Sequence, residues 1–225
     1  DALVEVHDAT ELDRALRLLC VIVVPAGVAL FVLAGPLVAV IFHYGEFTNF
    51  DAEMTRLALL AYAPALLGWS LVKVLAPGFF ARQDTVTPMR AATQSLVITI
   101  AMNVVLVGVA WYLKMLETPG LHLALAASNA VGALFNAWAL YRGLRRGSIL
   151  IPAPGWGALW LRVLAANLVM AALLVWLGGD LQGWLDASAR ERILRCAVCV
   201  FGGGGVYFAT LYVLGLRYRH LAQAA

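Results

Sequence analysis

Long apolar runs separated by short polar segments make up almost the whole chain. Each run is about 20 residues or longer, which is the length that an α-helix needs to cross the hydrocarbon core of a bilayer. The pattern therefore predicts six membrane-spanning helices, at approximately 16–42, 54–80, 88–113, 121–144, 156–177 and 193–216.

The polar connectors carry the residues that usually start and stop helices, such as Gly, Pro, Asn and Asp. Thr87 followed by Pro88 predicts a helix N-cap with proline at the first helical position. No low-complexity linker or soluble domain interrupts the series of apolar runs.

Composition supports an all-α integral membrane protein. Of the 225 residues, 63% are hydrophobic and 13% are charged, whereas soluble domains carry about a quarter charged residues. The first run follows an acidic stretch, so it is not a signal peptide, and without Met at position 1 we expect a piece of a longer protein. The three cysteines lie in apolar segments, which argues against a disulfide framework.

The distribution of basic residues predicts the orientation, because cytoplasmic loops are enriched in Lys and Arg. One side of the membrane would carry nine basic residues and the other side four, so both ends of this segment are expected to be cytoplasmic. The nine are Arg14, Arg17, Arg82, Arg90, Arg142, Arg145, Arg146, Arg217 and Arg219, and the four are Arg56, Lys114, Arg190 and Arg192.

Lys73 is a charged residue inside the second apolar run. It precedes Arg82 by nine residues, which places it roughly 13 Å from the cytoplasmic end of the helix. Charges at this depth are costly and usually face a cavity or a partner, although a lysine can also extend its side chain to the interface. Pro77 and Gly78 follow within about one turn and predict a hinge.

Polar residues also follow one face of the third run, where Ser95, Thr99 and Asn103 are spaced by four. The fourth run contains Ser128 and further small or amide residues. Such side chains commonly hydrogen-bond between membrane helices, but the stripe would also suit the wall of a cavity. No nucleophile, base and orienting residue occur together, so we do not expect an enzyme.

The stretch LVKVLAPGFFARQDTVTPMR, residues 71–90, closely resembles a segment of the MurJ (MviN) family of bacterial lipid II flippases, within the multidrug/oligosaccharidyl-lipid/polysaccharide exporter superfamily. The resemblance continues through LAGPLVAVIFHYGEFTNFDAEMTRLALLAYAPALLG and through GLHLALAASNAVGALFNAWALYRGLRR followed by PAPGW. It covers nearly the whole chain, and its least specific part is the glycine-rich last helix.

The resemblance implies a fourteen-helix flippase, of which these six spans are the last six. It implies a cytoplasmic segment at 1–15, four helices of the C-terminal lobe at 16–144, a cytoplasmic loop at 145–155 and two C-terminal helices with a lipid-tail groove and a cytoplasmic tail at 156–225. Trp160, Trp176, Tyr207 and the glycines 202–205 belong to the groove region. The first eight helices of the same protein would be the partner of this segment.

The implied function is movement of lipid II, the undecaprenyl diphosphate-linked disaccharide-pentapeptide, from the inner to the outer leaflet of the bacterial inner membrane by alternating access. Lys73, Ser70 and Asn103 are the expected cavity residues, and Arg82, Asp84 and Arg90 the expected cytoplasmic-loop residues.

The resemblance implies no cofactor. It implies that transport is coupled to Na⁺ or to the membrane potential. Some relatives bind Na⁺ through oxygens of helices seven, eleven and twelve. Asn103 and Ser128 are the nearest candidates here, although Val107 stands one turn after Asn103, where an acid would be expected.

Three other functions remain to be weighed against lipid II transport. The first is export of another polyprenyl-linked glycan, or cation-coupled drug export. The second is a membrane enzyme acting on prenyl phosphates, which would need clustered carboxylates for a metal. The third is a structural scaffold, which has little reason to retain a buried lysine.

Overall fold

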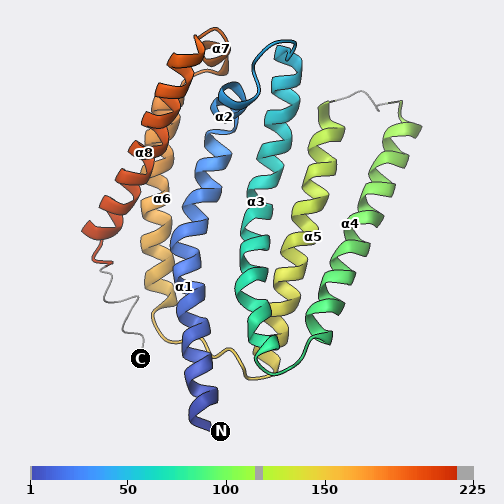
Figure 1. Cartoon of the computed structure of the whole chain (residues 1–225), viewed down its shortest axis with the longest axis vertical. Coiled ribbons are helices and arrows are strands. Elements are labelled where there is room, and N and C mark those ends of the chain that lie inside the picture. The colour runs from blue at the N-terminus through green and yellow to red at the C-terminus, as the bar shows by residue number, and fades with distance from the viewer. Residues whose placement is uncertain (1, 115–118, 217–225) are drawn as a thin grey trace.

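The computed structural model describes residues 2–114 and 119–216, and within these residues every regular element is a helix (Figure 1). Six helices are long and apolar enough to cross a membrane, which confirms the all-α class and the six predicted spans. The elements are α1 (Ala2–Val32), α2 (Ala34–Ile41), α3 (Asn49–Phe80), α4 (Val86–Tyr112), α5 (Pro119–Arg146), α6 (Trp156–Gly178), α7 (Leu181–Leu185) and α8 (Ala189–Val213).

The first predicted span, 16–42, is wrong as a single helix. α1 begins at Ala2 and ends at Val32, and a short α2 follows after a break at Leu33. Pro36 lacks the amide that would donate to the carbonyl of Val32, so a continuous helix loses a bond here. In the first turn of α2 the missing amide costs nothing, because that amide would have no partner in the helix.

The starts of α3, α4 and α8 also differ from the predicted ones, because side chains outside the apolar runs cap these helices; for α8 the cap is Ser188, and the helix begins at Ala189. Thr48 and Asp51 form a reciprocal capping box that starts α3 at Asn49. Asp84 accepts the backbone N–H groups of Val86 and Thr87 at 3.1 and 3.0 Å, so α4 starts at Val86. The prediction of Thr87 as N-cap and Pro88 as first helical residue is therefore wrong by two positions.

The connector between α6 and α8 contains α7, a short helix that the sequence pattern did not predict. Trp184 of α7 is buried, and its indole N–H donates to the carbonyl of Gly178 at the end of α6. The aromatic side chain thus folds this connector onto the end of the bundle.

The bundle has two main packed regions that share α1 and α3. One cluster of buried apolar residues joins α1, α2 and the start of α3 to α6, α7 and α8. The other joins the first part of α1 to α3, α5, the start of α4 and the loop before α6. α5 lies against α3 so closely that a Cβ at Gly68 would come within 2.6 Å of the Ala133 backbone.

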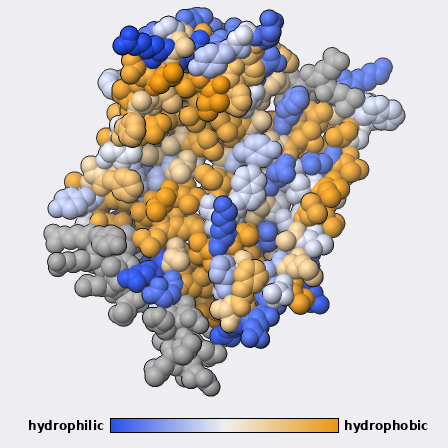
Figure 2. All heavy atoms as spheres, in the orientation of Figure 1, coloured by the Kyte–Doolittle hydropathy of each residue, from blue (hydrophilic) through white to orange (hydrophobic). Residues whose placement is uncertain are grey.

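The surface fits a membrane-spanning bundle. Apolar side chains dominate the middle of the face shown in Figure 2, while strongly hydrophilic ones collect mostly toward its two ends. Large apolar residues such as Trp176 and Phe201 are 77% and 80% exposed. The start of α1, the 81–85 turn and the 147–155 loop lie at one end of the bundle, and α8 runs toward this end from α7 at the other (Figure 1).

Candidate functional site

Lys73 lies on an exposed face of α3, together with Trp69 and Pro77 at spacings of four. The ring of Trp69 packs on that of Tyr62, with centroids 6.0 Å apart. Within the part of the chain that the structure describes, Lys73 makes no ion pair. Its ammonium is therefore presented outward from the six helices and not buried between them. Ser70, one turn before Lys73, is half-buried on the same helix.

The predicted polar stripe on α4 forms a seam with α5. The hydroxyl of Ser95 donates to the carbonyl of Gly132 at 2.7 Å. Thr99 donates to the carbonyl of Ser95 in its own helix at 3.0 Å. A Cβ at Gly132 would stand 2.1 Å from Oγ1 of Thr99, so this glycine is what lets the two helices approach. These residues act as interhelical contacts.

Asn103 and Ser128, the candidates for an ion site that the family resemblance implied, lie together on α4 and α5. The Oγ of Ser128 lies 2.5 Å from Oδ1 of Asn103 and 2.7 Å from the carbonyl oxygen of Leu125. Ser128 is fully buried. The Oγ of Ser128, the Oδ1 of Asn103 and the carbonyl oxygen of Leu125 therefore lie close together. Lys73 is not part of this group, because within the described residues it makes no hydrogen bond with Asn103 or Ser128.

Of the two predicted hinge residues, Pro77 is on the exposed face of α3, whereas Gly78 packs closely against neighbouring helices. The helix continues through Pro77 as far as Phe80. A Cβ at Gly78 would stand 3.1 Å from Leu144 and 3.3 Å from Leu12. Gly78 therefore serves the close approach of α1, α3 and α5, in addition to any freedom that it gives the backbone.

The predicted cytoplasmic-loop residues lie around the turn between α3 and α4. Arg82 and Arg90 are exposed. Hydrogen bonds from the side chain and backbone of Thr87 are the main cause of a lowered pKa at Asp84, and the charge of Arg90 adds to it. Arg217 and Arg219, which contributed to the predicted orientation, lie outside the described residues.

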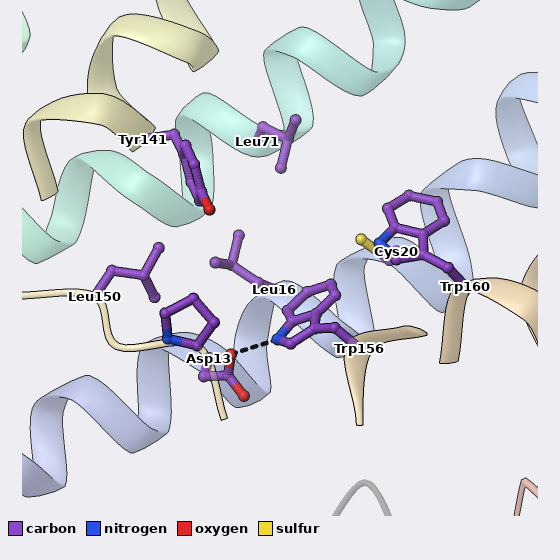
Figure 3. A pocket seen from close by; sticks show the side chains of 9 residues that line it. Asp13, Leu16, Cys20, Leu71, Tyr141, Leu150, Trp156 and Trp160 are labelled. Atoms are coloured by element: carbon purple, nitrogen blue, oxygen red, sulfur yellow. Dashed lines mark hydrogen bonds between the residues drawn. The ribbon is translucent and has the colours of Figure 1, made fainter. Parts of the chain in front are cut away.

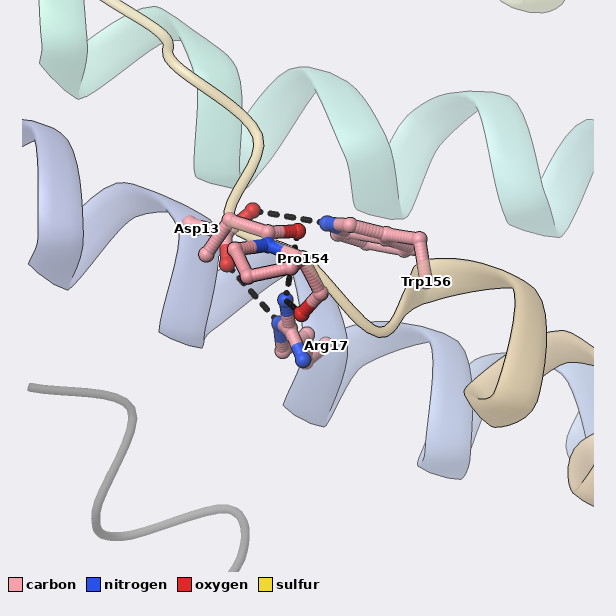
Figure 4. Close-up of polar contacts among 5 residues, drawn as sticks. Asp13, Arg17, Pro154 and Trp156 are labelled. Carbon is pink, nitrogen blue, oxygen red and sulfur yellow. Dashed lines mark hydrogen bonds and ion pairs between the residues drawn. The ribbon is translucent and has the colours of Figure 1, made fainter.

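A buried polar cluster that the sequence analysis did not predict joins α1 to the start of α6 (Figure 4). Asp13 accepts from Nε of Arg17 at 2.8 Å through one oxygen and from the indole of Trp156 at 2.8 Å through the other. Arg17 also donates to the carbonyls of Ala153 and Pro154 at 3.0 and 2.9 Å. Its guanidinium lies 5.3 Å from the ring centroid of Trp156.

Beside this cluster lies a pocket of about 440 Å³. It opens between α1, α3, the end of α5 and the start of α6, and apart from Asp13 its lining is apolar or aromatic (Figure 3). Its volume falls within the range of about 300–1,000 Å³ that small-molecule ligands occupy. The lining residues are Asp13, Leu16, Cys20, Leu71, Tyr141, Leu150, Pro152, Trp156 and Trp160.

A second apolar pocket, of about 220 Å³, lies in the predicted groove region between α1, α6 and α8. Gly203, Gly204 and Tyr207 contribute to its α8 wall. Gly203 lies so close to α6 that a Cβ there would stand 2.7 Å from Leu174. Trp160 lines the first pocket instead, and Trp176 is exposed on the outer surface.

At the opposite end of the bundle Arg192 fastens α8 to α2. It is buried and donates to the carbonyls of Ala39 and His43 at 3.0 and 2.9 Å. Ala39 lies in the last turn of α2, where helices leave carbonyl acceptors unpaired, and His43 follows two residues after the helix ends. The sequence analysis predicted Arg192 as a loop residue outside the membrane span. Its burial and its hydrogen bonds to α2 show that it instead holds two helices together.

The sequence matches a known family over most of its length. Residues 5–192 match the family model described as Lipid II flippase MurJ.

Among the described residues no group of three His, Cys, Asp or Glu could hold a metal ion.

Curated relatives agree with this match. The chain is 35% identical to the lipid II flippase MurJ of Burkholderia cenocepacia over 95% of its own length, and 34% identical to the probable lipid II flippase MurJ of Vibrio cholerae over 96%. A probable lipid II flippase MurJ of Buchnera aphidicola is 33% identical over 93% of the chain. The chain spans 40% of the first relative and 39% of each of the other two. On the family match and these relatives together, the chain belongs to the lipid II flippase MurJ family.

Proposed function

We propose that this chain is the C-terminal part of a bacterial lipid II flippase. It would help to move the undecaprenyl-linked peptidoglycan precursor from the inner to the outer leaflet of the cytoplasmic membrane by alternating access. The observation that carries the proposal is the match to lipid II flippases over 95% of the chain, together with six helices that could span a membrane. The relatives are flippases by name, which favours a transporter over an enzyme.

The proposal includes the partner and the orientation. The relatives are more than twice as long as this chain, so eight upstream helices of the same protein would complete the transport cavity. The ends of the segment would be cytoplasmic, because the basic residues predict that orientation. The last two long helices, from 156 onward, would form the groove for the lipid tail.

Lys73 is the proposed contact for the substrate diphosphate. A lysine in an apolar span is costly unless it faces a cavity or a partner, and this one is exposed on α3 and makes no ion pair among the described residues. An anionic diphosphate in a site shielded from water would be strongly attracted to it. Ser70 and Asn103 would be additional polar residues of the cavity wall.

Coupling to Na⁺ is proposed at Asn103 and Ser128, with the membrane potential as the alternative driving force. Hard cations prefer oxygen ligands, and the three oxygens around Ser128 suit them chemically. Ser128 and Asn103 already satisfy each other, however, and three oxygens are fewer than such ions usually take. Further oxygens from the upstream helices would have to complete the site.

The two apolar pockets are the proposed positions for lipid chains. Both lie against α1 and α6, and their walls are almost entirely carbon. Movement of α3 around Pro77 and Gly78 would be one way for the lobe to open and close, as in transporters with broken helices.

The test is complementation of a flippase-depleted strain by full-length protein carrying Lys73→Gln, with lipid II measured in each leaflet. We expect loss of growth and accumulation of lipid II in the inner leaflet, while Lys114→Gln, at the other lysine of the chain, grows normally. Normal export by Lys73→Gln would remove the proposed role of Lys73. Accumulation of a different lipid-linked glycan on depletion would favour export of that glycan over lipid II transport.

A further inference from the structure

A hydrogen bond joins the second half of α8 to the interior of α1. The hydroxyl of Tyr207 donates to the backbone carbonyl of Val21 at 2.8 Å, across 186 positions of the sequence. Both residues are buried, with Tyr207 only 1% exposed. A phenol in such apolar surroundings needs a partner for its polar end, and here the partner is a main-chain carbonyl of another helix.

The acceptor of this bond is not an ordinary helical carbonyl. In an α-helix the carbonyl of Val21 would accept from the amide of residue 25, but residue 25 is a proline and has no amide hydrogen. A proline in a helix interior normally kinks or breaks the helix. α1 nevertheless continues through Pro25 to Val32.

The position of Tyr207 is fixed from the other side by α6. Gly203 lies one turn before Tyr207 and packs directly against Leu174. Between α8 and α1, in contrast, the packing is incomplete, because the pocket of about 220 Å³ is lined by Pro25 and Tyr207. The hydroxyl therefore bridges two helices that leave space beside the proline.

We propose that Tyr207 is a positioning residue that replaces the hydrogen bond missing at Pro25. Its hydroxyl supplies the donor that the carbonyl of Val21 lacks within α1 and thereby links the conformation of α1 at Pro25 to the position of α8. When α8 moves away, the carbonyl of Val21 loses its donor and α1 becomes free to bend at Pro25. The coupling goes beyond the proposed transport function and does not depend on which lipid is moved.

The test is a double-mutant cycle read by hydrogen exchange of the full-length protein in lipid nanodiscs. Tyr207→Phe removes the hydroxyl and keeps the ring. We expect exchange of the α1 segment 21–32 to become about two- to tenfold faster, as the loss of one neutral hydrogen bond implies. Exchange in α5 should not change. Pro25→Ala restores the amide, so adding Tyr207→Phe to it should have little further effect on the segment.

The matched control is Tyr212→Phe, because Tyr212 lies on the same helix and is 71% exposed. It should leave the exchange of 21–32 unchanged. Three results would overturn the proposal: equal exchange in Tyr207→Phe and Tyr212→Phe, faster exchange of all helices alike, or the same effect of Tyr207→Phe with and without Pro25. If Pro25→Ala does not accumulate, the comparison of the two tyrosine variants decides alone.

Discussion

The indole of Trp156, the first residue of α6, donates to Oδ1 of Asp13 in α1 at 2.8 Å, across 143 positions of the sequence. The other carboxylate oxygen binds Arg17, which in turn holds the carbonyls of the loop before α6. One carboxylate thus connects the C-terminal helices to α1. Because Asp13 and Arg17 are buried, each needs the other as its charged partner.

We expect Asp13→Asn in the full-length protein to lower the free energy of unfolding by about 3 kcal/mol. Breaking a buried ion pair on one side leaves an uncompensated charge, here the guanidinium of Arg17, and typically costs about 3–5 kcal/mol. Arg17 would keep its hydrogen bonds to the two loop carbonyls, so we expect a loss of stability at the lower end of this range. Chemical denaturation in detergent micelles would measure the change.

The control for this prediction is Glu11→Gln on the same helix. Glu11 pairs with Arg14 at 3.3 Å, but this pair is largely exposed to solvent. Exposed pairs contribute between about 0 and 1 kcal/mol, so the variant should be nearly as stable as the parent. Equal stability of the Asp13 and Glu11 variants would mean that the buried cluster is not a structural joint.

Features that depend on residues close together in the sequence could be predicted, whereas contacts between distant residues could not. The six spans follow from the length of the apolar runs alone, and the structure has all six. The spacing of Asp13 and Arg17 by four is also readable as a helical pair. The contact of Asp13 and Arg17 with Trp156 cannot be predicted in this way, because nothing in the sequence indicates which distant residue packs against them.

Helix boundaries are set by local residues and are therefore easier to predict than contacts between distant residues. Thr48 and Asp51 form a capping box that is visible in the sequence of the connector, so the start of α3 at Asn49 is predictable from local residues. The exposure of Lys73 has no such signal, because the apolar residues around it are equally consistent with an interior and a lipid-facing helix. Only the packing of α3 against α5 and α1 fixes which face remains open.

Gly68→Ala should destabilise the protein, because the added methyl group would meet the backbone of Ala133 at 2.6 Å. Neither backbone can yield without separating α3 from α5, and overpacking of this kind costs about 1–3 kcal/mol. Gly108→Ala in α4 is the matched control, since nothing lies within 4 Å of its Cβ position. Thermal unfolding of both variants would show the difference, and equal melting temperatures would refute the close approach of α3 and α5.

Arg192→Lys should also destabilise the protein although the charge is kept. The guanidinium of Arg192 reaches Ala187 through Nε and two carbonyls near the end of α2 through one terminal nitrogen. A lysine is a point charge without this planar fork, so at least one buried carbonyl would lose its donor, at about 1–3 kcal/mol. Arg190→Lys, at an exposed position of the same helix, should have no measurable effect. A melting temperature of Arg192→Lys equal to that of Arg190→Lys would contradict the proposed fastening of α2.

The last prediction concerns pH and the turn between α3 and α4. Hydrogen bonds from Thr87 chiefly, then the N–H of Val86 and the charge of Arg90, lower the pKa of Asp84. A carboxylate whose pKa is lowered by folding stabilises the folded state above its ordinary value of about 4, and this contribution disappears as pH falls through the lowered value.

Between pH 5 and pH 8 the stability difference between the parent and Asp84→Asn should therefore be constant, because the Asp84 carboxylate stays ionised in this range and the asparagine does not titrate. Below about pH 4 the difference should shrink, because the parent carboxylate becomes protonated and loses its advantage as an acceptor at the start of α4. Melting temperatures of the two full-length proteins measured from pH 3 to pH 8 would test this. A difference that stays constant down to pH 3 would mean that the ionised form of Asp84 does not stabilise the turn.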